Sequence, residues 1–62
     1  MTNGEKLKTA REAKGYSLDE LAEKTGINTS TIYRIEHGKS KPHGITLRAL
    51  AKALGVKMEE LR

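Results

Sequence analysis

Residues 15–38, which read GYSLDELAEKTGINTSTIYRIEHG, decide the fold. Near the start of this stretch, Ser17 and Glu20 form a helix-start signature. The serine oxygen can accept a hydrogen bond from the amide of the glutamate, and the carboxylate can accept one from the amide of the serine. Gly26 suits the left-handed backbone that often follows the last turn of a helix. The pattern therefore predicts a helix over residues 18–25.

A second helix follows at once. Asn28 can cap it, because its side-chain oxygen can accept from the free amide two residues later. Gly38 is suited to ending it, so we expect the helix over about residues 29–37. Two short helices joined by a turn of about three residues that contains a glycine form a helix-turn-helix. Apolar or small side chains stand where two such helices share a core: Leu21, Ala22, Ile27, Ile32 and Ile35.

Further helical segments flank this motif. A capping pattern precedes a helix expected over about residues 4–14. After a basic loop, apolar side chains at spacings of three and four predict a helix over about residues 44–54, and a short turn is expected over residues 58–61. The chain shows no strand-like alternation. We therefore predict an all-α, compact fold of short helices that forms one helix-turn-helix domain over residues 1–62.

Size and composition exclude several functional classes. The chain has 62 residues, 35% of them hydrophobic, and no cysteine. A chain this short buries only about 60% of the surface that it exposes when unfolded, which leaves no deep catalytic cleft. We expect no catalytic residues, no cofactor and no small-molecule ligand. Thiolate metal sites and disulfides are excluded, and His37 and His43 have no third ligand in view, so we expect no metal.

No apolar run approaches the roughly twenty residues that cross a bilayer, and the first residues lack the apolar stretch of a signal peptide. We therefore expect a cytoplasmic protein without a membrane partner.

Basic side chains concentrate in the middle of the chain. Lysine and arginine total 12 against 8 acidic residues, a net charge of +4. The charges of residues 1–26 cancel, whereas residues 27–57 carry six basic side chains and a single acidic one. A polyanion is the partner that such a segment favours. The alternative is a solvated basic surface that serves solubility.

The chain resembles the lambda-repressor-like family of helix-turn-helix proteins, which includes phage repressors, Cro proteins and many small bacterial regulators. The resemblance covers nearly the whole chain and rests on Leu7–Lys14 with Arg11 in its middle, GYSLDELAEKTGI, STIYRIEHGKSKP and LRALAKALGV. It implies a compact five-helix domain that binds operator DNA, usually as a homodimer, with the helix over residues 29–37 as the recognition helix.

A helical wheel assigns the faces of the helix over residues 29–37 without use of the resemblance. Ile32 and Ile35 define the buried direction, and Ser30 and His37 then point away from it. Arg34 could donate two hydrogen bonds to the O6 and N7 atoms of guanine in the major groove. The alternatives are an ordinary exposed arginine and, at the neighbouring tyrosine, a ring that lies on the surface. The resemblance places the base-reading positions on Thr29, Ser30 and Arg34, with Tyr33 as their neighbour.

Contacts to DNA phosphates are expected from the start of this helix and from the basic loop after it. In this family, glutamine often stands at the first position of the preceding helix, where it touches the DNA backbone and supports the recognition helix. This chain has Leu18 there, which cannot do that. We therefore expect weaker or more shape-dependent discrimination between DNA sequences. The candidate phosphate contacts are Ser17, Asn28, Lys39 and Lys41.

Two further groups of residues concern structure and assembly. Arg11 and Glu36 both lie beside core positions of their helices, and the family pairs these positions in a salt bridge, so we expect that pair here. An exposed apolar end is expected to hold a weak homodimer that forms mainly on DNA. Its candidate residues are Val56, Met58 and Leu61.

The leading hypothesis is a sequence-specific regulator that binds double-stranded DNA, most often a repressor in this family, which occupies an operator. The alternative is a protein–protein interaction module, in an antitoxin-like or adaptor role, that uses the same fold. The sequence leaves open whether the chain is complete or the DNA-binding part of a longer protein.

Overall fold

The helices begin and end close to the residues that the caps and glycines indicate. A computed structural model describes residues 2–62, and its elements in chain order are α1 (Asn3–Ala13), α2 (Leu18–Thr25), α3 (Thr29–Glu36), α4 (Gly44–Leu54) and η1 (Met58–Leu61). The predicted all-α fold is confirmed, and residues 2–62 contain no strand. The last of the five expected helices is a single 3₁₀ turn, η1, rather than an α-helix.

Complete capping boxes start α1 and α2. The hydroxyl oxygen of Thr2 accepts from the Glu5 amide at 3.2 Å, and that of Ser17 accepts from the Glu20 amide at 3.0 Å. Each carboxylate accepts in return from the backbone amide of the capping residue. This hydrogen bond is the main cause of the lowered pKa of Glu5 and of Glu20, and the hydrogen bond with the capping hydroxyl is the second. These capping bonds therefore stabilise the folded chain at neutral pH, and this stabilisation is lost as the pH falls through the lowered pKa of each glutamate.

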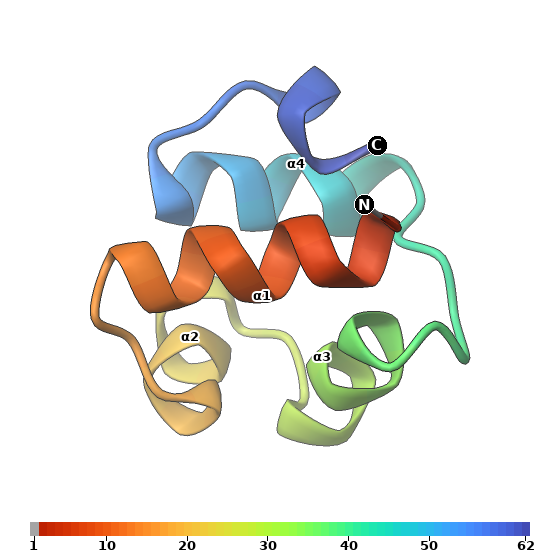
Figure 1. The fold of residues 1–62 in the computed structure, drawn as a ribbon. Helices are drawn as coiled ribbons and strands as arrows, with labels where there is room; N and C mark the ends of the chain where they lie inside the picture. Colours follow the sequence, from red (N-terminus) through yellow and green to blue (C-terminus); the bar gives the residue numbers. More distant parts are fainter. Residues whose placement is uncertain (1) are drawn as a thin grey trace.

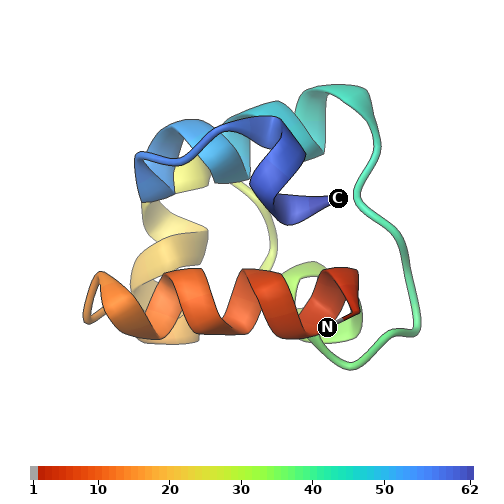
Figure 2. The same cartoon turned by 45° about the horizontal axis from the view of Figure 1, so that its top comes forward.

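The helices pack in two groups on either side of α1. Figure 1 shows α2 and α3 on one side of α1, seen nearly end-on, with α4 and η1 on the other side. In Figure 2, α2 connects the level of α1 to that of α4, and the loop from α3 to α4 runs around the outside. The first turn of α1 lies near the end of the chain, because the Lys6 ammonium group donates a hydrogen bond to the backbone carbonyl of Arg62.

A single apolar core fills the space between these helices. Side chains from α1, α2, α3, α4 and η1 all contribute to it: Leu7, Leu21, Ile32, Ile35, Leu47, Leu50, Ala51, Leu54 and Leu61. The expectation that Leu61 belongs to an exposed apolar end is wrong. Its side chain is 1% exposed, because η1 folds back against α1 and α4 and uses this leucine to close the core. Val56 and Met58 are only partly buried.

The first turn of α1 touches the last turn of α3 through a glycine. Gly4 is buried, and a Cβ atom added to it would overlap the backbone carbonyl oxygens of Ile35 and Glu36. Backbone atoms cannot rotate away as a flexible side chain can. Only glycine therefore lets α1 approach the end of α3 this closely.

We expect Gly4→Ala to lower the free energy of unfolding by about 1–3 kcal/mol, the usual cost of forcing an extra carbon into a packed site. In an open helix the same change stabilises by about 0.5–1 kcal/mol, so the sign alone tests the close approach. Urea unfolding followed by circular dichroism measures it. Glu12→Ala, on the exposed side of α1, is the control and should change the value by less than about 0.5 kcal/mol. A Gly4→Ala protein more stable than the parent would contradict this packing.

Candidate nucleic-acid interface

Helix α3 is anchored along one side and open along the other. Ile32 and Ile35 are 0% and 2% exposed, and they hold the helix against α1 and α2. The opposite side carries exposed polar side chains: Ser30, Tyr33, Arg34 and His37. The structure thus gives α3 the two faces that the helical wheel predicts.

The start of α3 is held by two side-chain hydrogen bonds. The Asn28 side-chain oxygen accepts from the Ser30 amide at 2.8 Å, which confirms asparagine as the cap. The Thr29 hydroxyl lies 3.2 Å from a carboxylate oxygen of Asp19, in the first turn of α2, and donates to it. No pattern of residues predicts this second bond, because Asp19 also fits an ordinary exposed helix start. Ser17, a candidate phosphate contact, is exposed, and its oxygen caps α2.

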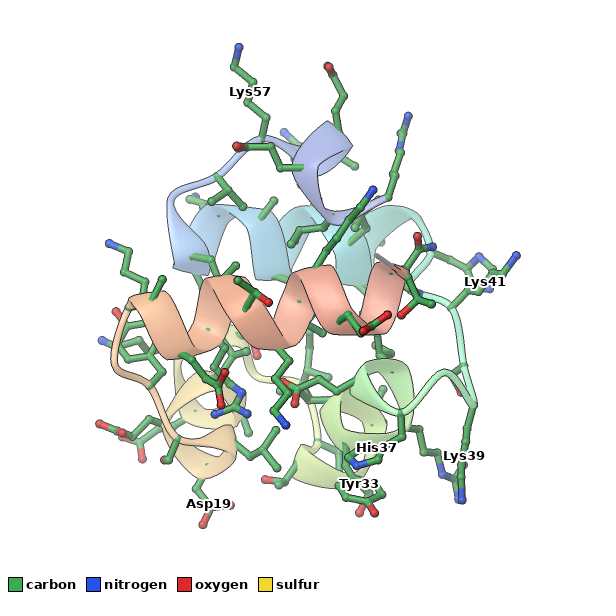
Figure 3. The ribbon with its side chains drawn as sticks, viewed as in Figure 1. Asp19, Tyr33, His37, Lys39, Lys41 and Lys57 are labelled. Atoms are coloured by element: carbon green, nitrogen blue, oxygen red, sulfur yellow. The ribbon has the colours of Figure 1, made fainter. Side chains whose placement is uncertain are left out.

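The end of α3 fixes where the basic loop begins. The Lys39 amide donates to the Arg34 carbonyl at 2.8 Å, and the Gly38 amide donates to that of Ile35 at 3.1 Å. Gly38 has a φ of 74°, a left-handed conformation that costs glycine little. The turn brings Lys39 back beside the exposed side of α3. Figure 3 shows Lys39 on the same side as Tyr33 and His37, whereas Lys41 points away from them.

A shallow depression gathers all four of the predicted base-reading residues. It is lined by Leu18, Thr29, Ser30, Tyr33, Arg34 and Lys39. The four candidate base-reading residues and one candidate phosphate contact therefore share one surface. Sequence reasoning considered Leu18 only as a departure from the family's glutamine, whereas the structure places it in the lining.

The aromatic ring on this surface is held in place by its neighbour. The rings of Tyr33 and His37 stack with their centroids 3.9 Å apart and their planes inclined by 21°. The His37 ring nitrogen Nδ1 lies 2.8 Å from the Tyr33 carbonyl oxygen, which fixes the imidazole over the tyrosine. Tyr33 is 45% exposed, so one part of the ring packs and the rest faces solvent.

A buried ion pair supports α3 from behind. Arg11 Nε lies 2.7 Å from Glu36 Oε2, and Arg11 Nη2 donates to Glu36 Oε1 at 3.1 Å, so the pair is bidentate. The side chains are only 11% and 2% exposed. Arg11 Nη1 also donates to the Tyr16 carbonyl at 2.8 Å. The hydrogen bonds to the carboxylate raise the pKa of Arg11 above its ordinary value. The structure contains the salt bridge that the sequence predicts.

Among residues 2–62, no three histidine, cysteine, aspartate or glutamate side chains are grouped to hold a metal ion. Within that range no helix combines the length and apolar character needed to cross a bilayer.

A family model described as helix-turn-helix matches residues 7–61. The chain is 40% identical over 58 residues to the SPbeta prophage-derived uncharacterized HTH-type transcriptional regulator YonR of Bacillus subtilis. It is 37% identical over 59 residues to the HTH-type transcriptional repressor RghR of the same organism. These matches cover 94% of this chain but 54% and 44% of the two relatives, so the chain spans about half their length.

A solved structure matches the whole fold. The crystal structure of the restriction-modification controller protein C.AhdI from Aeromonas hydrophila superimposes with a TM-score of 0.90 at 32% sequence identity. The match covers 97% of this chain and 91% of that one.

We expect Glu36→Ala to lower the free energy of unfolding by about 3–5 kcal/mol, because it leaves the Arg11 guanidinium buried without its partner. That is a large share of the roughly 5–15 kcal/mol that stabilises a domain. Urea unfolding provides the measurement, and Glu23→Ala, which removes an exposed carboxylate of α2, is the control. Removing both charges, with Arg11→Met and Glu36→Leu together, should recover most of the loss. A loss of less than about 0.5 kcal/mol in Glu36→Ala would mean that the pair contributes no more than two solvated charges do.

Proposed function

Because this chain belongs to the helix-turn-helix family, in its lambda-repressor-like branch, we propose that it is a sequence-specific transcriptional regulator that binds double-stranded DNA. Residues 1–62 would act as one DNA-binding domain that occupies an operator as a repressor, without an enzymatic activity. The observation that carries the proposal is the depression on α3. Arg34 and Lys39 line it together with short polar side chains, and the opposite side of the helix is buried through Ile32 and Ile35.

Insertion of α3 into the major groove follows from this geometry. A major groove about 12 Å wide admits an α-helix, and the side that faces the bases is the one opposite the anchor. Arg34 would donate two hydrogen bonds to guanine, while Ser30 and Tyr33 would contact neighbouring base edges or thymine methyl groups. Thr29, in the first turn, lies where recognition helices approach the bases.

Phosphate contacts would position the domain without reading sequence. Lys39, which lines the depression, and Lys41, further along the loop, would reach the DNA backbone on the side of the α3 C-terminus. Ser17 and Asn28 would face the backbone near the starts of α2 and α3, in addition to their capping bonds. Direct contacts and electrostatic attraction together would hold α3 in its groove.

Assembly into a weak homodimer, formed mainly on DNA, would set two copies of α3 about 34 Å apart, one turn of B-DNA. With Leu61 in the core, the partly buried Val56 and Met58 remain as its apolar contacts. Such a regulator would work in the cytoplasm, beside the DNA that it binds.

The first test is the dependence of DNA affinity on salt. If a dimer contacts six or so phosphates, log K should fall against log salt with a slope of about 5. Lys39→Ala should reduce that slope by about one per subunit, because it removes one counterion-releasing contact. Fluorescence anisotropy with a labelled duplex measures the slope. The control is Lys57→Ala, since Lys57 extends from the side of the molecule opposite α3 (Figure 3). A flat response to salt, or affinity weaker than about 10 μM at low salt for every duplex, would favour an interaction module that binds protein.

The second test concerns base reading by Arg34. A selection from random duplexes should enrich a symmetric motif, and Arg34→Ala should then lose about 1–3 kcal/mol on that motif. Binding to unrelated duplexes should stay nearly unchanged, because phosphate contacts supply it. Arg48→Ala, an exposed arginine of α4, is the matched control and should leave the preference for the motif unchanged. Equal losses on selected and unrelated DNA would assign Arg34 to the phosphates instead.

A further inference from the structure

The bond between Thr29 and Asp19 lies at one end of the depression on α3. Thr29 lines that depression, and its hydroxyl lies 3.2 Å from Asp19 Oδ1. Asp19 is exposed and extends from the same side of the molecule as Tyr33 and His37 (Figure 3). A ligand that covers the exposed side of α3 would therefore meet Asp19 as well as Thr29.

The direction of this hydrogen bond limits what Thr29 can do. A hydroxyl group has one hydrogen, and a carboxylate only accepts. With its hydrogen donated to Asp19, the Thr29 oxygen has only lone pairs left for another partner. The second carboxylate oxygen of Asp19 also only accepts. The Asp19–Thr29 pair thus presents acceptors alone, whereas Arg34 and Lys39, elsewhere in the lining, present donors alone.

The edges of the bases differ in the hydrogen-bond donors that they offer to Asp19 and Thr29. In the major groove, cytosine presents the N4 amino group and adenine the N6 amino group, both donors. Guanine presents only acceptors, O6 and N7, and thymine presents O4 and a methyl group. A carboxylate beside guanine O6 would add repulsion to the missing hydrogen bond. Acceptors fixed at this end therefore discriminate in favour of an exocyclic amino group.

We propose that Asp19 and Thr29 together are a specificity determinant, which selects cytosine or adenine at the base pair facing the start of α3. This inference rests on the DNA-binding function proposed above. Asp19 holds the hydrogen of the Thr29 hydroxyl, and the lone pairs of the Thr29 oxygen accept from the amino group of the base.

The test begins with two selections from random duplexes, one with the parent protein and one with Thr29→Val. Valine keeps the shape of threonine and removes the hydroxyl. The position of the half-site at which the two motifs differ identifies the base that Thr29 faces. We expect cytosine or adenine there for the parent, and the enriched base shows which of the two supplies the amino group.

The second step removes the amino group from the DNA. The parent motif is made with 2-pyrimidinone in place of that cytosine, or purine in place of that adenine. The parent protein should bind this duplex about five- to tenfold more weakly than the intact motif, and Thr29→Val should bind both equally. Asp19→Asn should also lose discrimination, because its amide can turn a donor toward the base. Glu23→Gln removes the same charge elsewhere on α2 and should keep the discrimination of the parent. Thermal unfolding of each variant confirms that it is folded.

The outcomes separate this inference from the function on which it rests. The inference is overturned, with DNA binding intact, if the two motifs are identical, if guanine or thymine is enriched at the position that differs, or if Asp19→Asn discriminates as the parent does. A purely structural Asp19–Thr29 bond would produce that last result, with lowered stability and an unchanged preference. If no motif is enriched at all, the DNA-binding function and this inference fall together.

Discussion

The buried pairing of Arg11 with Glu36 is the interaction on which the position of α3 depends. Glu36 is the last residue of α3, where the helix dipole disfavours a negative charge, and its side chain is 2% exposed. An unpaired carboxylate in that place would be strongly destabilising. The Arg11 guanidinium supplies two donors to it and a third to the Tyr16 carbonyl, so a single side chain joins α1, the turn after α1 and α3. No buried side-chain polar atom within residues 2–62 lacks a partner. An isolated helix of eight residues is marginal in water, which is why this external support matters.

Sequence reasoning predicted those features whose cause is local or periodic. The caps at Ser17 and Asn28 and the glycine at position 26 set the bounds of α2 and α3, and the isoleucine spacing set the faces of α3. Features that depend on how two elements pack against each other could not be predicted from the sequence. Gly4 looks like an ordinary glycine near a helix start until the end of α3 is seen against it. Leu61 has the same spacing whether η1 is open or folds back, and only the packed structure distinguishes the two. The roles of individual residues toward DNA stay predictions, because they depend on a second molecule.

At the start of α3, the polar contact with α2 comes from the second residue of α2 rather than from the first. With Leu18 where the resemblance leads one to expect glutamine, the first residue of α2 offers no polar group to α3. The structure places Leu18 in the depression beside Thr29, while the next residue, Asp19, makes the hydrogen bond across to α3. The polar connection between the two helices is thereby retained, but in the form of a charge that accepts and cannot donate.

The stacked rings of Tyr33 and His37 have a consequence for the thermodynamics of association. A side chain that moves freely before binding loses rotamer entropy when a partner immobilises it, at a cost of about 0.5–1.5 kcal/mol for each such group. Here the imidazole already restrains the phenol ring, through the stacking and through its own contact with the Tyr33 carbonyl. Preorganisation of this kind lets the most extended aromatic surface on α3 meet a partner with much of its ordering complete, so more of the contact energy is available as affinity.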